Sequence, residues 1–188
     1  IVLLPVSKTL GYFILGLGTA FKGLSLLSLG AMPLTDSKIF YQAMNISVNH
    51  PMVGVIFGVI STAIIQSSSV IIGILIALAQ NDLLELQAAL PIILGSNLGT
   101  CITAFLASFG SGRTAKQVAL AHGLLNVLGI IVFYPILGPF ASLTSLTSPS
   151  IPRQIANAHT LYNFLSSVLV LPFSKYFSKL VMIIFPNS

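Results

Sequence analysis

The stretch Thr62-Ala63-Ile64-Ile65-Gln66-Ser67-Ser68-Ser69 decides how this chain of 188 residues folds. It lies in the middle of an uncharged run, 52–80, where an amide and three hydroxyls follow one another between two apolar arms. Four consecutive polar side chains are costly in a straight helix that faces lipid, whereas the tip of a re-entrant hairpin holds them against protein or a cavity. The arms, 52–65 and 70–80, are shorter than the ~20 residues that a spanning helix needs. The pattern therefore predicts a re-entrant helical hairpin over 52–80.

The composition places this hairpin in a membrane protein. Hydrophobic residues make up 55% of the chain and charged residues only 6%, with a mean hydropathy of +1.01. A soluble domain has roughly a quarter of its residues charged, so a soluble enzyme and a disordered tail are excluded. The cations occur singly rather than in a run, which does not favour a nucleic-acid partner. Because the chain begins with Ile rather than Met, we expect a piece of a longer protein, or a processed one.

Apolar runs elsewhere are long enough to cross a bilayer. They are 9–31, 86–109, 115–138 and 154–173. The run 86–109 contains Gly95-Ser96-Asn97-Leu98-Gly99-Thr100, whose glycines around polar residues predict a break, and Gly-interrupted membrane segments point to transporter binding sites. We therefore expect one all-α polytopic membrane unit over 1–188, with about four spanning helices, the re-entrant hairpin and a broken helix at 86–109.

The charges predict the orientation of this unit. If 52–80 enters and leaves on one side, five cations share one side of the membrane: Lys8, Arg113, Lys116, Lys175 and Lys179. The other side holds Lys38, Arg153 and the three acids Asp36, Asp82 and Glu85. This is a positive-inside bias, and it largely vanishes if 52–80 crosses instead. The count predicts that both termini are cytoplasmic and that the hairpin opens to the outside.

The predicted hairpin tip combines groups that suit an anion with groups that suit a cation. Gln66, Ser67, Ser68 and Ser69 both donate and accept hydrogen bonds. The N-terminus of the second arm favours an anion, and the carbonyls that end the first arm suit Na⁺, a hard cation that prefers oxygen. The alternative is that these serines only join neighbouring helices.

A local pattern, Ala-x-Ala-His-x-Leu-x-Asn, occurs at 119–126 and again at 156–163. Its His and Asn are four residues apart and share one helix face, so His122 pairs with Asn126 and His159 with Asn163. Interhelical hydrogen bonding, worth ~0.6 kcal/mol on average in membranes, is one interpretation. A role in orienting the interrupted segments or in relaying a proton is the other.

Sequence patterns typical of enzymes are missing from the chain. It contains no Gly-x-Ser-x-Gly elbow, no His-Glu-x-x-His and no Walker A sequence, and its three acids lie in connectors. The single cysteine, Cys101, excludes a cysteine-based metal cluster. We therefore expect neither an enzyme nor a cofactor.

At Thr62–Ser69 the chain resembles the type II sodium-dependent phosphate cotransporter family, whose hallmark is Gln-Ser-Ser-Ser in a re-entrant hairpin. The segment 95–101 resembles the family's Gly-Ala-Asn-Ile-Gly-Thr-Thr, and the segments ending at Asn126 and Asn163 resemble its Ala-His-x-Leu-Phe-Asn. The resemblance runs in order over roughly residues 10–173. Family members carry two such units in inverted orientation, and this chain resembles the second.

The resemblance implies Na⁺-coupled symport of inorganic phosphate by an integral protein of the plasma or inner membrane. It implies that Gln66, Ser67, Ser68 and Ser69 contact phosphate and Na⁺, and that Ser96, Asn97 and Thr100 support them from the facing break. Further supporting residues are Thr62, His122, Asn126, His159 and Asn163. The expected partners are phosphate, Na⁺, the lipid bilayer, and a second repeat or subunit that completes the site. The alternative is a non-transporting scaffold or phosphate sensor that keeps the fold.

Overall fold

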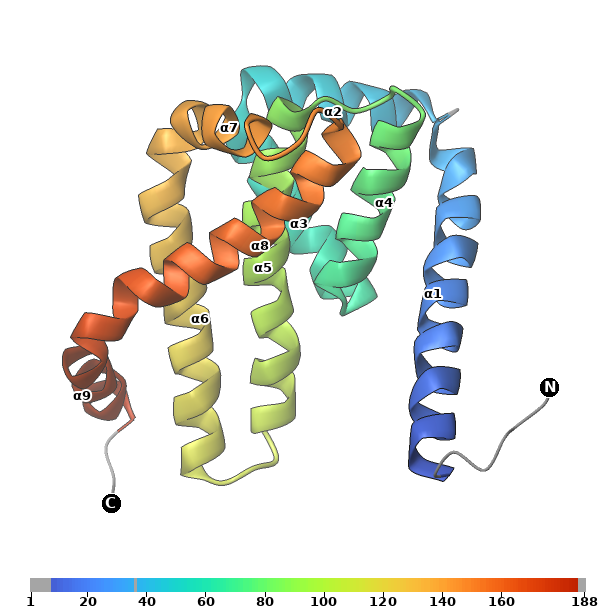
Figure 1. Cartoon of the computed structure of the whole chain (residues 1–188). Helices are drawn as coiled ribbons and strands as arrows, with labels where there is room; N and C mark the ends of the chain where they lie inside the picture. Colours follow the sequence, from blue (N-terminus) through green and yellow to red (C-terminus); the bar gives the residue numbers. More distant parts are fainter. Residues whose placement is uncertain (1–7, 36, 186–188) are drawn as a thin grey trace.

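The computed structural model describes residues 8–35 and 37–185, and the regular structure of these residues is entirely helical (Figure 1). This confirms the all-α prediction. In chain order the elements are α1 (Lys8–Thr35), α2 (Lys38–Asn49), α3 (Pro51–Ile65), α4 (Ser68–Gln80), α5 (Leu86–Ser108), α6 (Arg113–Phe133), η1 (Tyr134–Ile136), α7 (Leu137–Ser145), α8 (Ile151–Val170), η2 (Leu171–Phe173) and α9 (Ser174–Ile184).

Helix α5 lies at the centre of the structure, against α3, α6 and α8. In the described residues, three helical stretches are long and apolar enough to cross a membrane: Leu86–Ser108, Arg113–Ser145 and Ile151–Ile184. The share of the apolar window that is buried falls from 61% in the first to 28% and 6% in the others. Helix α5 is therefore surrounded by protein, whereas the other two stretches turn most of their apolar side chains outward.

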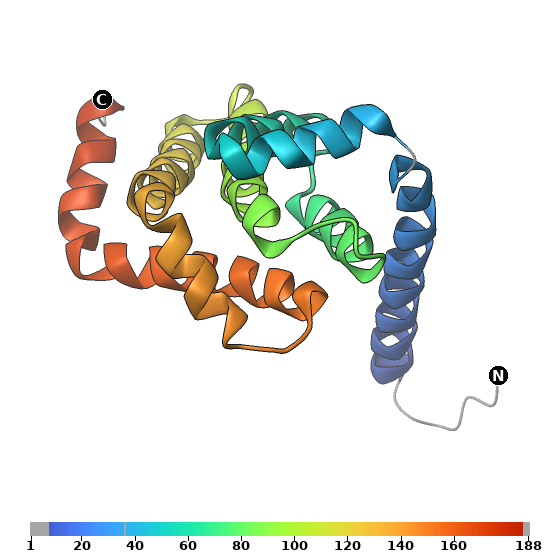
Figure 2. The ribbon, with the colours of Figure 1, turned by 90° about the horizontal axis from the view of Figure 1, so that it is seen from above.

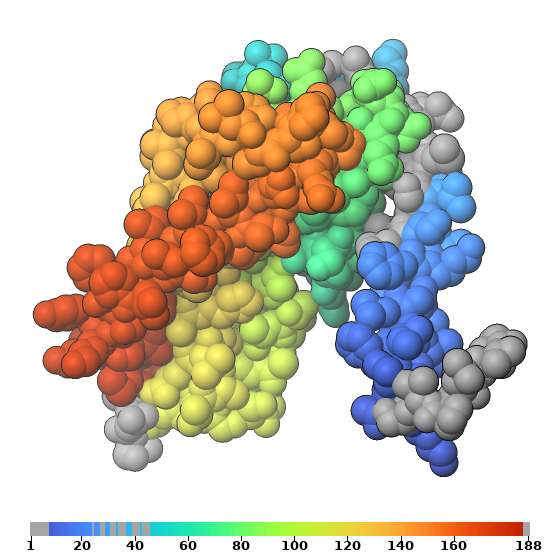
Figure 3. Space-filling model, viewed as in Figure 1, coloured from blue at the N-terminus to red at the C-terminus, as the bar shows by residue number. Residues whose placement is uncertain are grey.

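These three stretches contain the predicted spans 115–138 and 154–173 in full and 86–109 except for its last residue. The fourth predicted span, 9–31, lies in α1, a helix of 28 residues that stands beside α4 at one flank of the molecule (Figures 1, 2 and 3). That α1 crosses the membrane stays a prediction.

Helices α3 and α4 run in opposite directions and meet at Gln66 and Ser67 (Figure 1). Helix α3 begins with Pro51, whose missing N–H costs nothing in a first turn. It ends where Gln66 adopts the left-handed conformation, with φ of 60°, and donates its backbone N–H to the Thr62 carbonyl at 2.6 Å. Ser67 then caps α4, because its Oγ accepts the N–H of Val70 at 3.4 Å. The polar residues thus interrupt the run 52–80 at the predicted place.

The predicted break at 95–100 is wrong. Helix α5 is continuous from Leu86 to Ser108, and its polar side chains bond to their own helix. The two glycines serve another purpose, which is close contact with α3. A Cβ on Gly95 would collide with the backbone carbonyl of Val55, and one on Gly99 would lie 2.6 Å from the Val59 carbonyl oxygen.

The contact between α3 and α5 is therefore made largely of backbone, and we name it the α3–α5 seam. Helix α3 contributes to it from the other side, because a Cβ on Gly58 would meet the Ile92 carbonyl and lie 2.8 Å from the Ser96 nitrogen. Small residues at such spacing let two membrane helices approach closely. The seam consists of Gly54, Gly58 and Thr62 on α3, and Pro91, Gly95 and Gly99 on α5.

Charged residues gather at the two ends of the helical bundle. The starts of α1 and α6 lie toward one end, where Lys8, Arg113 and Lys116 are found (Figure 1). The connector between α4 and α5, with Asp82 and Glu85, lies at the other. The third acid, Asp36, lies outside the described residues. The positions of these five residues match the predicted grouping, and the orientation of the unit in the membrane stays a prediction.

Proline-containing 3₁₀ turns carry two long helices into a further helix each. Pro135 in η1 joins α6 to α7, and Pro172 in η2 joins α8 to α9. Each proline follows the Asn of the repeated Ala-His pattern by nine residues, at Asn126 and Asn163. Each copy of the Ala-His pattern is therefore followed, at the same distance along the chain, by a proline turn and a further helix.

Candidate functional site

The candidate site is built around the tip between α3 and α4. The side chains of Gln66 and Ser69 are exposed there, and those of Ser67 and Ser68 are half-buried. The first N–H groups of α4 and the last carbonyls of α3 meet at this point, because the two helices join there. Such groups at helix ends have no intrahelical hydrogen-bond partners. One end of the tip therefore offers donors, the other offers acceptors, and neither α3 nor α4 contains a charged residue.

The α3–α5 seam fixes the height of the tip along α5. Gly54 faces Pro91 and Thr62 faces Gly99, so the two helices run in the same direction. Gln66 lies one turn beyond Thr62, and Thr103 lies one turn beyond Gly99, which puts them at the same level. The Thr103 hydroxyl donates to the Thr100 carbonyl at 2.7 Å. The tip thus lies beside the polar part of α5.

The three residues predicted to support the tip from α5 do not converge on one point. Ser96 is fully buried next to the seam, and its hydroxyl donates to the Ile93 carbonyl at 2.8 Å. Thr100 is half-buried and donates to the Ser96 carbonyl at 3.0 Å. Asn97 shares a helix face with Cys101, which approaches the His122 carbonyl of α6 at 3.6 Å. Ser96 and Thr100 therefore lie toward the hairpin, and Asn97 toward α6.

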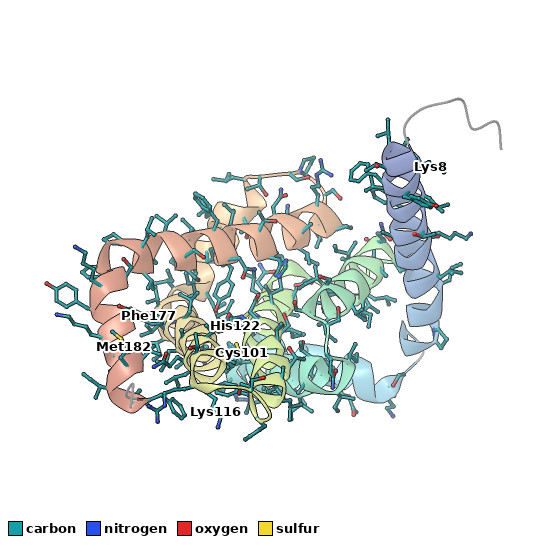
Figure 4. All side chains as sticks on the ribbon, turned by 90° about the horizontal axis from the view of Figure 1, so that it is seen from below. Lys8, Cys101, Lys116, His122, Phe177 and Met182 are labelled. Atoms are coloured by element: carbon teal, nitrogen blue, oxygen red, sulfur yellow. The ribbon has the colours of Figure 1, made fainter. Side chains whose placement is uncertain are left out.

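A second polar cluster joins α5, α6 and α8 in the interior. The amide of Asn126 donates to the Cys101 sulfur at 3.2 Å and to the His122 carbonyl at 3.0 Å, and Figure 4 shows Cys101 and His122 together between the helices. From α8, the buried hydroxyl of Tyr162 donates to the Asn126 carbonyl at 3.4 Å. Asn126 thus makes interhelical contacts, while His122 contributes its backbone carbonyl.

The second His–Asn pair has the same local bond in different surroundings. The Asn163 amide donates to the His159 carbonyl at 2.9 Å, as Asn126 does to His122. Asn163 is exposed and His159 is half-buried, whereas Asn126 is buried. The repeated pattern therefore produces one interior contact and one outward-facing amide.

Comparison with known proteins identifies the family. The profile described as Na⁺/Pi-cotransporter matches residues 31–138, which is more than half of the chain. The chain belongs to the Na⁺/Pi-cotransporter family. This confirms the resemblance seen in the sequence and, with the apolar helices, identifies an integral membrane protein of a transporter family.

Relatives in this Na⁺/Pi-cotransporter family come from bacteria and from mammals. Uncharacterized protein YqeW of Bacillus subtilis is 39% identical over 142 residues, covering 76% of this chain and 46% of that protein. Sodium-dependent phosphate transport protein 2B of Pongo abelii is 32% identical over 145 residues, covering 71% and 21%. Protein 2A of Rattus norvegicus is 34% identical over 98 residues, covering 49% and 15%. The chain thus spans less than half the length of these relatives, and no solved structure matches it.

Sequence reasoning missed several polar residues of this family member. Cys101 and Tyr162 complete the interior cluster, and Thr103 lies level with the tip; the four-residue spacing of Cys101 from Asn97 was the available signal. Among the described residues, the buried hydroxyl of Thr62 has no hydrogen-bond partner. An unsatisfied buried group costs ~1–3 kcal/mol. Thr62, predicted as a supporting residue, therefore keeps a hydroxyl free one turn before the tip.

Proposed function

We propose that this chain forms one half of a transporter that carries inorganic phosphate together with Na⁺ across the cell membrane. The observation that carries the proposal is the interrupted helix pair, whose uncharged polar tip lies one turn beyond the contact of Thr62 with Gly99 of α5, in a member of the Na⁺/Pi-cotransporter family. The mammalian relatives are named for sodium-dependent phosphate transport, which supports the same substrates.

In this proposal α3 and α4 form a re-entrant hairpin that enters and leaves the membrane on one side. Their 15 and 13 residues give lengths of ~22 and ~20 Å, less than the ~30 Å of a hydrocarbon core. Figure 1 agrees with this placement, because the tip ends well before the turn between α5 and α6. The hairpin opens toward Asp82 and Glu85, and by the positive-inside rule that end faces outward and both termini are cytoplasmic. Helix α1 is the fourth spanning helix.

The tip holds the two substrates by complementary helix ends. Phosphate accepts hydrogen bonds from the hydroxyls of Ser67, Ser68 and Ser69 and from the first N–H groups of α4, where the helix dipole favours an anion. Na⁺ is coordinated near the same tip by the carbonyls that end α3 and by the Gln66 amide oxygen. Helices α3, α4 and α5 contain no charged residue, so bound Na⁺ supplies the positive charge that phosphate needs.

The other wall of the site comes from a second repeat or a second subunit. This chain contains one Gln-Ser-Ser-Ser and covers less than half of the relatives that it matches. In the family to which the chain belongs, we assign it to the second of two inverted units. The exposed amide of Asn163 and the exposed side of the tip are then the surfaces available to the first unit.

Uptake of labelled phosphate by proteoliposomes of the full-length protein tests the proposal. We expect uptake that rises with an inward Na⁺ gradient and disappears when Na⁺ is replaced by K⁺. Uptake that is indifferent to Na⁺ would remove the coupling. Phosphate binding without uptake would instead identify a phosphate sensor, and the lack of both would identify a scaffold that keeps the fold.

A further inference from the structure

We propose that α9 and the start of α6 form a binding surface for the headgroups of anionic lipids at one membrane–water boundary. The surface, which we name the basic surface, consists of Arg113 and Lys116 on α6 and Lys175 and Lys179 on α9. It is remote in sequence from the hairpin tip and goes beyond the transport function proposed above.

The orientation of α9 is the first observation. Pro172 in the 3₁₀ turn η2 ends α8, and the chain changes direction there. Helix α9 is seen nearly end-on in Figure 1 and along its length in Figure 2, so its axis lies across those of α5 and α6. If α5 and α6 cross the bilayer, α9 lies parallel to the membrane plane.

The contacts of α9 set its position along α6. It packs on α6 and buries Val181, which is 5% exposed. The Gln117 amide of α6 donates to the Phe185 carbonyl, just after α9, at 2.7 Å. Figure 4 shows Phe177 and Met182 on α9 and Lys116 on α6, all on the opposite flank from Lys8. Helix α9 is therefore held beside the first turns of α6, where a spanning helix leaves the membrane.

The exposed side chains of α9 are of two kinds. Lys175 and Lys179 are one turn apart and share a face. Beside them, Tyr176 and Ile183 are 73% and 75% exposed, and Leu180 and Ile184 are exposed as well. A helix with cations along one face and large apolar side chains along the other is typical of helices that lie in the membrane interface. The apolar side chains have a natural place among acyl chains, and the lysines reach the headgroups.

Within residues 8–35 and 37–185, the two acids Asp82 and Glu85 lie in the connector between α4 and α5, at the other end of the bundle from the start of α6. The three acids of the sequence are Asp36, Asp82 and Glu85, so no carboxylate side chain follows residue 85. Arg113 and Lys175 moreover stand in the first turns of α6 and α9, where the helix dipole opposes a cation. The described residues therefore supply no carboxylate for these cations, and the proposed partner is an external anion.

The occupant that fits both kinds of side chain is an anionic phospholipid. Inorganic anions in water would match the cations but would leave Tyr176 and Ile183 exposed to water. A lipid brings a phosphate to the lysines and acyl chains to the apolar face together. Each Lys or Arg near a charged membrane surface strengthens binding by roughly fivefold.

Quenching by brominated lipids tests this assignment. Tyr176→Trp in the full-length protein adds one tryptophan on α9, and the emission of this variant minus that of the unmutated protein reports on α9. The protein is placed in phosphatidylcholine vesicles that contain either brominated phosphatidylglycerol or the same fraction of brominated phosphatidylcholine. We expect stronger quenching by the anionic lipid, and a preference that falls as salt shortens the ~10 Å screening length of 0.1 M solutions.

Charge variants locate the preference on the molecule. Lys175→Gln and Lys179→Gln should each lower the relative affinity for the anionic lipid by roughly fivefold. Lys8→Gln, on the other flank, and Arg153→Gln, near the opposite end, are matched controls that should leave it unchanged. Equal quenching by both lipids, or equal losses in the controls, would overturn the proposal.

Two further outcomes would also overturn it by naming another occupant. Quenching by neither lipid would mean that protein, such as the other half of the transporter, covers α9. Loss of the preference on adding inorganic phosphate at constant ionic strength would mean a site for free anions. None of these readouts depends on transport, so the result is independent of the function proposed for the hairpin.

Discussion

Thr62 of α3 rests directly on Gly99 of α5: a Cβ on residue 99 would lie 2.7 Å from the Cβ of Thr62. This contact lies one turn before Gln66, where α3 ends. The polar tip can lie at this position because residue 99 is a glycine, which has no side chain to hold the two helices apart. The hydroxyl of Thr62 is buried at this contact and has no hydrogen-bond partner among the described residues.

Gly99→Ala should destabilise the protein although alanine is the better helix former. In an open helical position the change gains up to ~1 kcal/mol, but here the methyl group meets Val59 and Thr62, and overpacking costs ~1–3 kcal/mol. Gly138→Ala in α7 is the matched control, because nothing lies within 4 Å of its added Cβ. Thermal unfolding in detergent should show a lower transition for Gly99→Ala alone. Equal transitions would show that the seam is looser than described.

Thr62→Val should stabilise the protein more than the same substitution at Thr144 does. Removing the unpartnered hydroxyl relieves a penalty of ~1–3 kcal/mol. Thr144 is equally buried, but its hydroxyl donates to the Phe140 and Ala141 carbonyls, so Thr144→Val gains nothing of this kind. Thermal unfolding of both variants makes the comparison. A Thr62→Val protein less stable than Thr144→Val would mean that the hydroxyl has a partner in the membrane.

Ser68→Ala and Ser69→Ala should each lower the apparent affinity of uptake for phosphate or for Na⁺ by at least tenfold. A hydrogen bond to a charged group is worth ~1.5–3 kcal/mol, which corresponds to roughly 10- to 150-fold in affinity. Ser145→Ala is the control, because that exposed hydroxyl donates only to the Ser142 carbonyl and lies in α7. The measurement is phosphate uptake by the full-length protein at varied phosphate and Na⁺. Unchanged dependence in both hairpin variants would contradict the proposed site.

Lys22→Gln should leave phosphate affinity unchanged. Lys22 is exposed on α1, and the tip is proposed to hold phosphate with hydroxyls, N–H groups and bound Na⁺. The same uptake assay compares this variant with the serine variants. Collapse of affinity in Lys22→Gln, with normal affinity in Ser68→Ala, would move the phosphate site to α1.

Asn126→Ala should cost more stability than Asn163→Ala. The Asn126 amide reaches Cys101 across the α5–α6 contact, whereas the Asn163 amide bonds within its own helix and is exposed. Interhelical hydrogen bonds in membranes average ~0.6 kcal/mol and reach ~1.7. Thermal unfolding of the two variants measures the difference. A larger loss for Asn163→Ala would show that the outward amide has a partner in the complete protein.

The sequence predicted the interruption at Gln66 and Ser67 because four polar side chains in a row fit no lipid-facing helix. It did not predict that 95–100 stays helical, since glycines beside polar residues suit a broken helix and a close helix contact equally well. What separates the two is Gly58, distant in the chain but facing Gly95 across the seam. The hydroxyl of Ser96 and the amide of Asn97 then find acceptors one turn back in the same helix.

The sequence also gave no sign of two features of α8 and α9. The last predicted span, 154–173, was expected to end the helical structure, but the 3₁₀ turn at Pro172 redirects the chain and a new helix begins. Tyr162 lies within the second Ala-His pattern, yet its bond to Asn126 depends on how α8 crosses α6. Such crossings follow from packing among several helices, which local patterns do not encode.

The backbone character of the α3–α5 seam bears on how the hairpin can move. Interlocked side chains resist sliding, because each must change its rotamer as one helix passes another. The seam resists sliding through its backbone instead, because a shift of α3 along α5 would bring a side chain to a place beside Gly58, Gly95 or Gly99 where there is no room even for a Cβ. The hairpin and α5 therefore keep their relative height when either of them moves. We expect the tip to move together with α5 as one rigid body. Spin labels on α4 and α5 would record this as a constant difference in height between the two helices.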